Sequence, residues 1–264
     1  MNPKIRLIVT GCCGRMGSLI AEEALKRGDR FVLAAAIEHD SHPMIGRPHP
    51  TAPFLKISTD LKTALGQADL LVEFTTPEAT LSNAALAASA KIPMVIGTTG
   101  FSAGQMETLK KHSVHTPIFW SPNMSIGIVI IRRAIHHVSE QLFKFGLGAQ
   151  THVQISETHH TRKKDKPSGT AKALAEELLK ATGWLVKDEE IESVREGEVV
   201  GIHSVTFNTG PELITLRHEA VDRRLFAQGA LLVAGNFHKI LNGNKTGWYS
   251  MDDFTNAMQN QRVP

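Results

Sequence analysis

The chain has few cysteines and no long apolar run, and both shortages limit what kind of protein it is. Its two cysteines, Cys12 and Cys13, are adjacent, so they cannot staple a fold and supply too few ligands for a zinc site. No stretch of about 18 apolar residues is present, which argues against a transmembrane helix. The N-terminal residues also lack the apolar stretch and cleavage site of a signal peptide. We therefore expect a reduced, cytoplasmic protein.

Charge and composition narrow the class further. The chain carries 29 Lys and Arg against 26 Asp and Glu, and the net charge of +3 is too small and too dispersed for a nucleic-acid-binding protein. Its 264 residues, 42% of them hydrophobic, suffice for one large domain or two modest ones, each with a buried core. We find no internal repeat or low-complexity stretch in the sequence.

The first half alternates between two hydrophobic periods. Short apolar runs, typical of buried strands, lie at 5–10, 31–37, 70–75, 94–98 and 118–120. Helical spacing lies between them at 16–27, 77–90 and 103–112, and the segment 39–53, rich in His and Pro, is expected to be a loop. Strand and helix in turn predict a Rossmann-like α/β fold, a doubly wound parallel sheet whose ligand binds at the carboxyl ends of its strands.

The pattern changes after about residue 126. Helices are predicted at 124–142 and 170–182, with a short strand at 153–157. Two long strands follow at 198–208 and 212–219 without a helix between them, which indicates a second, α+β domain with an antiparallel or mixed sheet. A helical tail at 224–241 is expected to return to the first domain.

A glycine-rich turn, G-x-x-G-x-x-G, follows the first predicted strand. Gly11 permits a tight turn, Gly14 lets the backbone approach a pyrophosphate, and Gly17 lets the next helix pack closely. The N-terminus of that helix offers N–H groups and a partial positive charge to the phosphates. The order of strand, turn and helix indicates a dinucleotide site, and an ordinary surface turn is the alternative.

Glu38 ends the second predicted strand, 21 residues after Gly17, at the spacing expected for a carboxylate on the adenosine ribose. Its charge favours NAD over NADP, because it would repel a 2′-phosphate. Arg15, His39 or Arg47 could offset that repulsion, so the choice of cofactor stays open. Two later strand ends, 74–77 and 97–100, carry small and hydroxylated residues against which a nicotinamide ribose could lie, although each could equally be a plain turn.

The segment 157–171, E-T-H-H-T-R-K-K-D-K-P-S-G-T-A, places two histidines and four basic residues ahead of a predicted helix. Ser168 or Thr170 can cap that helix, whose N–H groups suit a carboxylate or a phosphate. Lys163 can supply charge and a proton, and a histidine can act as an acid near neutral pH. An anionic substrate that becomes protonated needs such groups, whereas a solvated basic loop is the alternative. Because no third ligand stands at a usual zinc spacing, we expect no metal.

These motifs together resemble the dihydrodipicolinate reductases of bacterial and plant lysine biosynthesis. The family's signature, close to E-x-H-H-x-x-K-x-D-x-P-S-G-T-A, matches residues 157–171 almost throughout. The glycine turn at 11–17, E-F-T-x-P at 73–77, G-T-T-G at 97–100 and the segment 121–127, which looks like the family's hinge, match in the same order. The resemblance therefore runs along nearly the whole chain.

The resemblance implies an activity and a role for each matched residue. A hydride from NADH or NADPH would add to C4 of the cyclic substrate and an acid would protonate the neighbouring carbon, giving tetrahydrodipicolinate. His159 would be the general acid, and Lys163 a proton donor that also holds a substrate carboxylate. The other substrate-binding positions are His160, Ser168, Gly169, Thr170 and Arg223. The cofactor positions are Gly11, Cys12, Cys13, Gly14, Arg15, Met16, Glu38, His39, Phe74, Gly97, Thr98, Thr99, Ser121, Pro122, Asn123 and Met124.

The resemblance also implies an architecture. Residues 1–125 with 222–264 would form the dinucleotide-binding domain, and 126–221 a substrate-binding domain whose mixed sheet builds a homotetramer. Domain closure about the hinges would accompany catalysis.

Three alternatives stay open. Another nicotinamide-dependent oxidoreductase would keep the glycine turn but would not need His159, His160 and Lys163 together. A non-catalytic dinucleotide sensor would bind the cofactor without turnover. A nucleic-acid-binding protein is opposed by the shortness of the basic run at 162–164.

Overall fold

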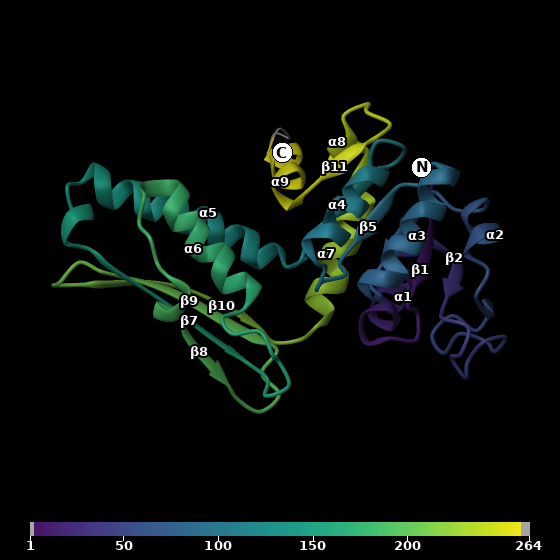
Figure 1. The fold of residues 1–264 in the computed structure, drawn as a ribbon, viewed down its shortest axis with the longest axis horizontal. Coiled ribbons are helices and arrows are strands. Elements are labelled where there is room, and N and C mark those ends of the chain that lie inside the picture. The colour runs from purple at the N-terminus through teal and green to yellow at the C-terminus, as the bar shows by residue number, and fades with distance from the viewer. Residues whose placement is uncertain (1–2, 260–264) are drawn as a thin grey trace. The chain divides into compact units, whose positions relative to one another are not determined.

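The computed structural model describes residues 3–259, which divide into two compact units (Figure 1). Unit 1 contains the described chain up to Met124 and again from Phe226, and unit 2 is Ser125–Leu225. Within residues 3–259, no helix has the length and apolar character that crossing a bilayer requires.

The described residues of unit 1 form a seven-stranded sheet in the order β11-β6-β5-β4-β1-β2-β3, with every neighbouring pair parallel. The chain winds outward from β1 in one direction and from β4 in the other, so the two central strands mark the point where ligands bind in doubly wound folds. This confirms the predicted α/β fold. The strands are β1 Ile5–Thr10, β2 Phe31–Ile37, β3 Ile57–Ser58, β4 Leu70–Glu73, β5 Met94–Ile96, β6 Pro117–Trp120 and β11 Gly247–Tyr249.

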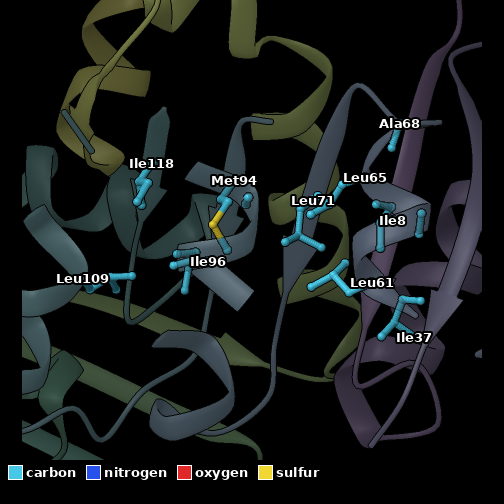
Figure 2. Packing of buried hydrophobic residues seen from close by; sticks show 13 residues of the cluster. Ile8, Ile37, Leu61, Leu65, Ala68, Leu71, Met94, Ile96, Leu109 and Ile118 are labelled. Carbon is cyan, nitrogen blue, oxygen red and sulfur yellow. The ribbon is translucent and has the colours of Figure 1, made fainter. Parts of the chain in front are cut away.

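Helices cover both faces of this sheet. Figure 2 shows one face, where strand residues such as Ile8 and Leu71 pack with Leu61, Leu65 and Leu109 from the helices. Side chains alternate along a strand, so the equally buried neighbours of Ile8 point to the other face, against which α1 packs. The helices are α1 Arg15–Lys26, α2 Leu61–Leu65, α3 Pro77–Ala90, α4 Ala103–His112, α7 Arg224–Gly235, α8 Phe237–Leu241 and α9 Met251–Gln259.

Unit 2 packs two helices against a mixed sheet in the order β10-β9-β7-β8. β9 is antiparallel to both β10 and β7, whereas β7 and β8 are parallel, which confirms the predicted second fold. Figure 1 shows α5 and α6 side by side along this sheet. The strand residues Ile155, Val205 and Phe207 are buried in the core of this unit. The elements are α5 Ile126–Lys144, α6 Gly169–Thr182, β7 His152–His159, β8 Glu192–Arg195, β9 Gly201–Asn208 and β10 Leu213–Ala220, with short 3-10 turns at Gly148–Gln150 and Asp188–Glu190.

Two predicted elements differ in a way that matters for function. The strand predicted at 153–157 extends to His159, which places this histidine at a strand end and not in a loop. The single helix predicted at 224–241 is wrong, because it breaks at Asn236. The backbone of Asn236 leaves the helical region (φ −116°, ψ 14°), and its side-chain amide donates to the carbonyl of Leu232 at 2.8 Å.

The remaining differences concern short elements. β3, α2, β8 and β11 have two to five residues each, too few for a hydrophobic period to emerge. The predicted strand at 198–208 begins at Gly201, since Glu198 lies in the preceding turn. α9 lies beyond the last predicted helix.

Two helix glycines provide a matched test of the packing. A Cβ at Gly229 in α7 would overlap the backbone oxygen of Met124, whereas a Cβ at Gly104 in α4 would meet nothing within 4 Å. We expect Gly229→Ala to lower the free energy of unfolding by about 1–3 kcal/mol, because backbone must move. Gly104→Ala should raise it by about 0.5–1 kcal/mol, because alanine favours the helix. Denaturant titrations measure both, and equal effects would contradict this packing.

Candidate active site

A cavity of about 1050 Å³ opens in unit 1 beside the carboxyl ends of β1 and β4. Six predicted cofactor residues line it, namely Gly11, Cys13, Gly14, Glu38, His39 and Phe74. Asp60, Lys62 and Asn83 also line it, and none of these three was predicted from the sequence. Asp60 and Lys62 belong to the start of the five-residue helix α2, which carries too little pattern to be predicted.

The glycine turn has the geometry that its sequence predicts. Gly11 adopts a left-handed backbone (φ +61°), and a Cβ there would press on Thr75 and on the carbonyl of Phe74 at 3.0 and 3.1 Å. A Cβ at Gly17 would overlap the carbonyl oxygen of Gly11, so only glycine lets α1 begin against the turn. Gly14 is the N-cap of α1 and provides no side-chain acceptor, which leaves the first-turn N–H groups suited to an anion.

Glu38 lies directly against this turn. One carboxylate oxygen accepts a hydrogen bond from the backbone N–H of Cys13 at 2.9 Å, and the other accepts from the N–H of His39 at 3.1 Å. Buried His49, from the segment predicted as a loop, pairs through Nε2 with the carbonyl of Cys12 at 3.3 Å. The turn is therefore held from both sides.

Cys12 and Cys13 occupy different environments. The side chain of Cys12 is fully buried in the core, and this burial raises the pKa of its thiol. Cys13 is half-buried and lines the cavity. The buried Cys12 side chain is therefore unsuited to the predicted cofactor contact, for which only its backbone would be available.

The ends of β4 and β5 meet around Glu73, which is completely buried. Its carboxylate accepts hydrogen bonds from Thr10 at 2.7 Å and Asn83 at 2.8 Å, and also from Thr75 and Thr80. Burial raises the pKa of Glu73, and these hydrogen bonds oppose the shift. The network joins β1, β4 and α3 at the central edge of the sheet.

Phe74, Gly97 and Thr98 lie together as predicted from their strand ends. A Cβ at Gly97 would overlap the Phe74 ring, so the ring lies directly against the glycine. Thr98 Oγ1 accepts from the N–H of Thr75 at 3.1 Å, which ties the two strand ends. Within residues 3–259, the other predicted cofactor positions do not line this cavity: Cys12, Arg15, Met16, Gly97, Thr98, Thr99, Ser121, Pro122, Asn123 and Met124.

The second group of predicted residues gathers in unit 2, at the end of β7. Glu157 and His159 are two residues apart on the same face of the strand, and both are buried, at 1% and 8% exposure. Nδ1–H of His159 donates to one oxygen of Glu157, and Arg195 donates to the other at 2.9 Å. An ionised carboxylate only accepts, so Nδ1 carries a proton and Nε2 is the ring nitrogen at which the neutral imidazole can accept a further proton.

Opposing effects set the charges of this pair. Burial lowers the pKa of His159, and the Glu157 carboxylate works against that shift. Burial alone would raise the pKa of Glu157, but hydrogen bonds from Arg195, Ser193 and His159 outweigh it and lower this pKa. A stably ionised carboxylate therefore lies beneath a histidine that can gain and lose a proton.

The loop after β7 and the start of α6 supply the other predicted substrate residues. Lys163 Nζ pairs with Asp165 at 2.7 and 2.8 Å. Ser168 caps α6 by accepting from the N–H of Ala171 at 3.2 Å, and its own N–H donates to Glu157 at 3.3 Å. Space is open around Gly169, where a Cβ would meet nothing within 4 Å. A ligand can therefore approach the N-terminus of this helix.

His160 and Arg223 belong to the same charged surroundings. Burial lowers the pKa of His160, and the positive charge of Arg223 adds to that shift. Thr170 is half-buried in the first turn of α6. The structure thus places all the predicted substrate residues of the loop in one unit, around the strand end that carries His159.

Three residues of this site were missed from the sequence: Arg195, His203 and His218. Strand pairing sets His203 opposite both Glu157 and His218. The His203 ring lies edge-on to His159 with centroids 4.9 Å apart, and its Nε2 pairs with Ser168 Oγ at 3.3 Å. Alternation within the two predicted strands could have indicated a common face, but the register between strands was not readable from the sequence.

A third potential metal ligand, which the sequence spacing did not indicate, is His203 on the neighbouring strand β9. Ligand atoms of Glu157, His159 and His203 lie within 4.8 Å of one another. However, the Arg195 guanidinium already neutralises the Glu157 carboxylate, which disfavours a cation at this position.

Comparisons with known proteins agree in both halves of the chain. A family model described as "Dihydrodipicolinate reductase, N-terminus" matches residues 5–124, and one described as "Dihydrodipicolinate reductase, C-terminus" matches residues 127–255.

Two curated relatives show the same likeness at full length. A 4-hydroxy-tetrahydrodipicolinate reductase of Caldanaerobacter subterraneus subsp. tengcongensis is 34% identical, over 94% of this chain and 97% of the relative. Another, from Nitratidesulfovibrio vulgaris, is 38% identical, over 86% of this chain and 92% of the relative.

Among solved structures, a dipicolinate-bound dihydrodipicolinate reductase from Paenisporosarcina sp. TG-14 superimposes with a TM-score of 0.74. It covers 96% of this chain and 99% of the other at 21% identity, which shows a shared fold.

The neutral form of His203 should make stability depend on pH. Burial lowers its pKa to about 3, against about 6.5 in an unfolded chain, so the unfolded state binds more protons between these values. The stabilisation is complete above pH ~6.5 and is lost as the pH falls. We expect His203→Asn to reduce the loss of unfolding free energy between pH 7 and 5 by about 2 kcal/mol. Urea titrations at fixed protein concentration measure this, with exposed His238→Asn as control; an unaltered slope would contradict the burial argument.

Proposed function

Because the chain belongs to the dihydrodipicolinate reductase family, we propose that it reduces 4-hydroxy-tetrahydrodipicolinate to tetrahydrodipicolinate with NADH or NADPH, a step of diaminopimelate and lysine biosynthesis. The family models account for both units, and the named relatives match nearly the whole chain. The observation that carries the proposal within the molecule is the buried pair of Glu157 and His159 beside the open N-terminus of α6.

Unit 1 is proposed as the dinucleotide-binding domain. Its cavity, the uncapped first turn of α1 and the carboxylate of Glu38 fit a dinucleotide, with the pyrophosphate at the N–H groups of α1 and the adenosine ribose at Glu38. The surfaces at Phe74 and at Gly97–Thr99 are proposed for the nicotinamide ribose. When bound there, the reduced nicotinamide supplies the hydride.

Unit 2 is proposed as the substrate-binding domain. The Paenisporosarcina protein holds dipicolinate, a planar dicarboxylate, and a dicarboxylate needs fixed cations and N–H donors. Lys163, His160 and Arg223 supply positive charge or hydrogen-bond donors, and the N–H groups of Gly169 and Thr170 lie at the positive end of α6.

His159 is proposed as the general acid. In the overall reaction the substrate loses its 4-hydroxyl and a proton from the neighbouring carbon as water, gains a hydride at C4 and regains a proton at that neighbouring carbon. The proton comes from Nε2, because Nδ1 is engaged by Glu157. The Glu157 carboxylate stabilises the imidazolium before transfer, and Lys163 is a second donor that also holds a carboxylate.

The assembly and location of the chain are proposed from the family resemblance. The face of the mixed sheet away from α5 and α6 carries exposed Gln154, Thr215 and Arg217, and we propose that this face builds a homotetramer. A cytoplasmic location agrees with a biosynthetic reductase that uses a nicotinamide cofactor.

The test of the function is oxidation of NADH and of NADPH, followed by the absorbance of the reduced nicotinamide. The substrate is formed in place from pyruvate and aspartate semialdehyde by the preceding synthase. Turnover that depends on the substrate supports the proposal, and the two rates decide between the cofactors. Cofactor binding without turnover would contradict it and favour a different oxidoreductase or a sensor.

His159→Gln should lower kcat by about 10²–10⁴-fold, as loss of a general acid does. The Kd of NADH should stay nearly unchanged, because the proposed cofactor residues lie in unit 1. His137→Gln, an exposed histidine of α5, is the matched control and should leave kcat unaltered. Wild-type turnover in His159→Gln would remove His159 from the mechanism.

Glu38→Ala should weaken the binding of NADH by about 10–100-fold, because charged hydrogen bonds to the ribose are lost. The binding of NADPH should weaken less, since repulsion of its 2′-phosphate disappears as well. Glu38→Gln keeps an acceptor for the Cys13 N–H without the charge, and so separates turn geometry from electrostatics. Fluorescence titration with each cofactor measures the constants, and equal weakening of both would place Glu38 away from the ribose.

A further inference from the structure

Arg195, the last residue of β8, links the pair of Glu157 and His159 to the loop that carries Lys163. Its Nε donates to the carbonyl of Lys163 at 3.2 Å, and its Nη2 donates to the carbonyl of Asp165. Its Nη1 donates to the Glu157 carboxylate at 2.9 Å. One guanidinium therefore contacts the loop backbone at two points and also the carboxylate that holds His159.

Burial explains why this contact is strong. The side chain of Glu157 is wholly buried and that of Arg195 is 14% exposed. A carboxylate removed from water stays ionised only where it is paired and hydrogen-bonded. Arg195 and the N–H of Ser168 share one oxygen of Glu157, which leaves the other oxygen for His159.

We propose that Glu157 and Arg195 are positioning residues for proton transfer. Arg195 keeps Glu157 ionised and sets the loop of Lys163, and Glu157 holds the Nδ1 proton of His159 so that Nε2 faces the substrate. The proposal rests on the proposed function, in which His159 is the acid. The structure thereby assigns a role in the reaction to a buried carboxylate and a largely buried arginine that need not touch the substrate.

Only an arginine side chain can donate to these three separated acceptors at the same time. Each nitrogen of the guanidinium donates in a different direction, and the three acceptors belong to β7 and to two points of the loop. A lysine ammonium carries its donors on one atom and cannot reach all three. Arg195→Lys therefore keeps the charge beside Glu157 but loses the loop contacts.

The groups facing His159 define what Glu157 does to its proton affinity. Glu157 on β7 favours the protonated form, and Lys163 and Arg195 oppose it. His203 on β9 is neutral at ordinary pH, because its pKa is about 3, and His218 on β10 lies behind it. Glu157 is thus the anion that sustains the imidazolium.

The first experiment is an NMR titration of labelled histidines. The signal of His159 is assigned as the one that is missing from the spectrum of His159→Gln. Glu157→Gln keeps an oxygen that accepts from Nδ1–H but removes the charge, and should lower the His159 pKa by about 1 unit or more. The alkaline limb of the plot of kcat against pH should move to lower pH by a similar amount. An unchanged His159 pKa would overturn the role of Glu157. This measurement needs no turnover, so it succeeds or fails independently of the proposed reaction.

The second experiment concerns Arg195 and uses the wild-type enzyme as its activity reference. Arg195→Ala should lower kcat/KM by about 10²-fold, as loss of a buried charge partner does, with the Kd of NADH unchanged. Added guanidinium ion should restore about 10-fold of this loss. Arg195→Lys, which keeps the charge but not the loop contacts, should be faster than the alanine variant and remain well below wild type.

The matched control is Arg162→Gln, which removes an exposed arginine–carboxylate pair with Glu198 from the same loop. Its kcat/KM should stay within about threefold of wild type, because exposed pairs contribute little. Wild-type activity in Arg195→Lys, or a folded Arg195→Ala that guanidinium does not rescue, would overturn the positioning role. If Arg195→Ala does not fold, Arg195→Lys and the Glu157→Gln titration decide the question.

Discussion

The candidate site of unit 2 depends on one buried carboxylate, that of Glu157. It accepts hydrogen bonds from His159 on its own strand, from Arg195 on β8 and from the N–H of Ser168 at the start of α6. A buried carboxylate without these partners would cost several kcal/mol, so the three elements must meet where they do. Their meeting point places a protonatable histidine beside an open helix N-terminus.

Unit 1 also contains a buried carboxylate, that of Glu73, which joins separate elements through hydrogen bonds. Glu73 collects hydrogen bonds from Thr10 on β1 and from Asn83 and Thr80 on α3, at the edge where the two windings of the sheet separate. The glycine turn and the Phe74 strand end extend from that point and border the cavity. In both units, a desolvated carboxylate joins separate elements at strand ends, and residues predicted to bind ligands lie around that junction.

The division of chemistry between the units favours a reductase over the alternatives. A dinucleotide sensor has no need of a buried Glu157–His159 pair held by Arg195, an arrangement that costs desolvation free energy. A different oxidoreductase would share unit 1 alone, whereas the family resemblance extends through residues 127–255. The mild, dispersed charge of the chain leaves nucleic-acid binding without support.

The local features could be predicted from the residues alone: the boundaries of β1, β2, α3 and α4, the glycine turn, the kinds of fold in both halves, and the family through its segment 157–171. Local periodicity and turn chemistry are enough for these. The contacts that bring Arg195 and His203 to His159, and the place of Lys62 in the cavity lining, became visible only in the folded chain. Those contacts depend on register between strands and on elements of four or five residues, and neither leaves a periodic signal along the chain.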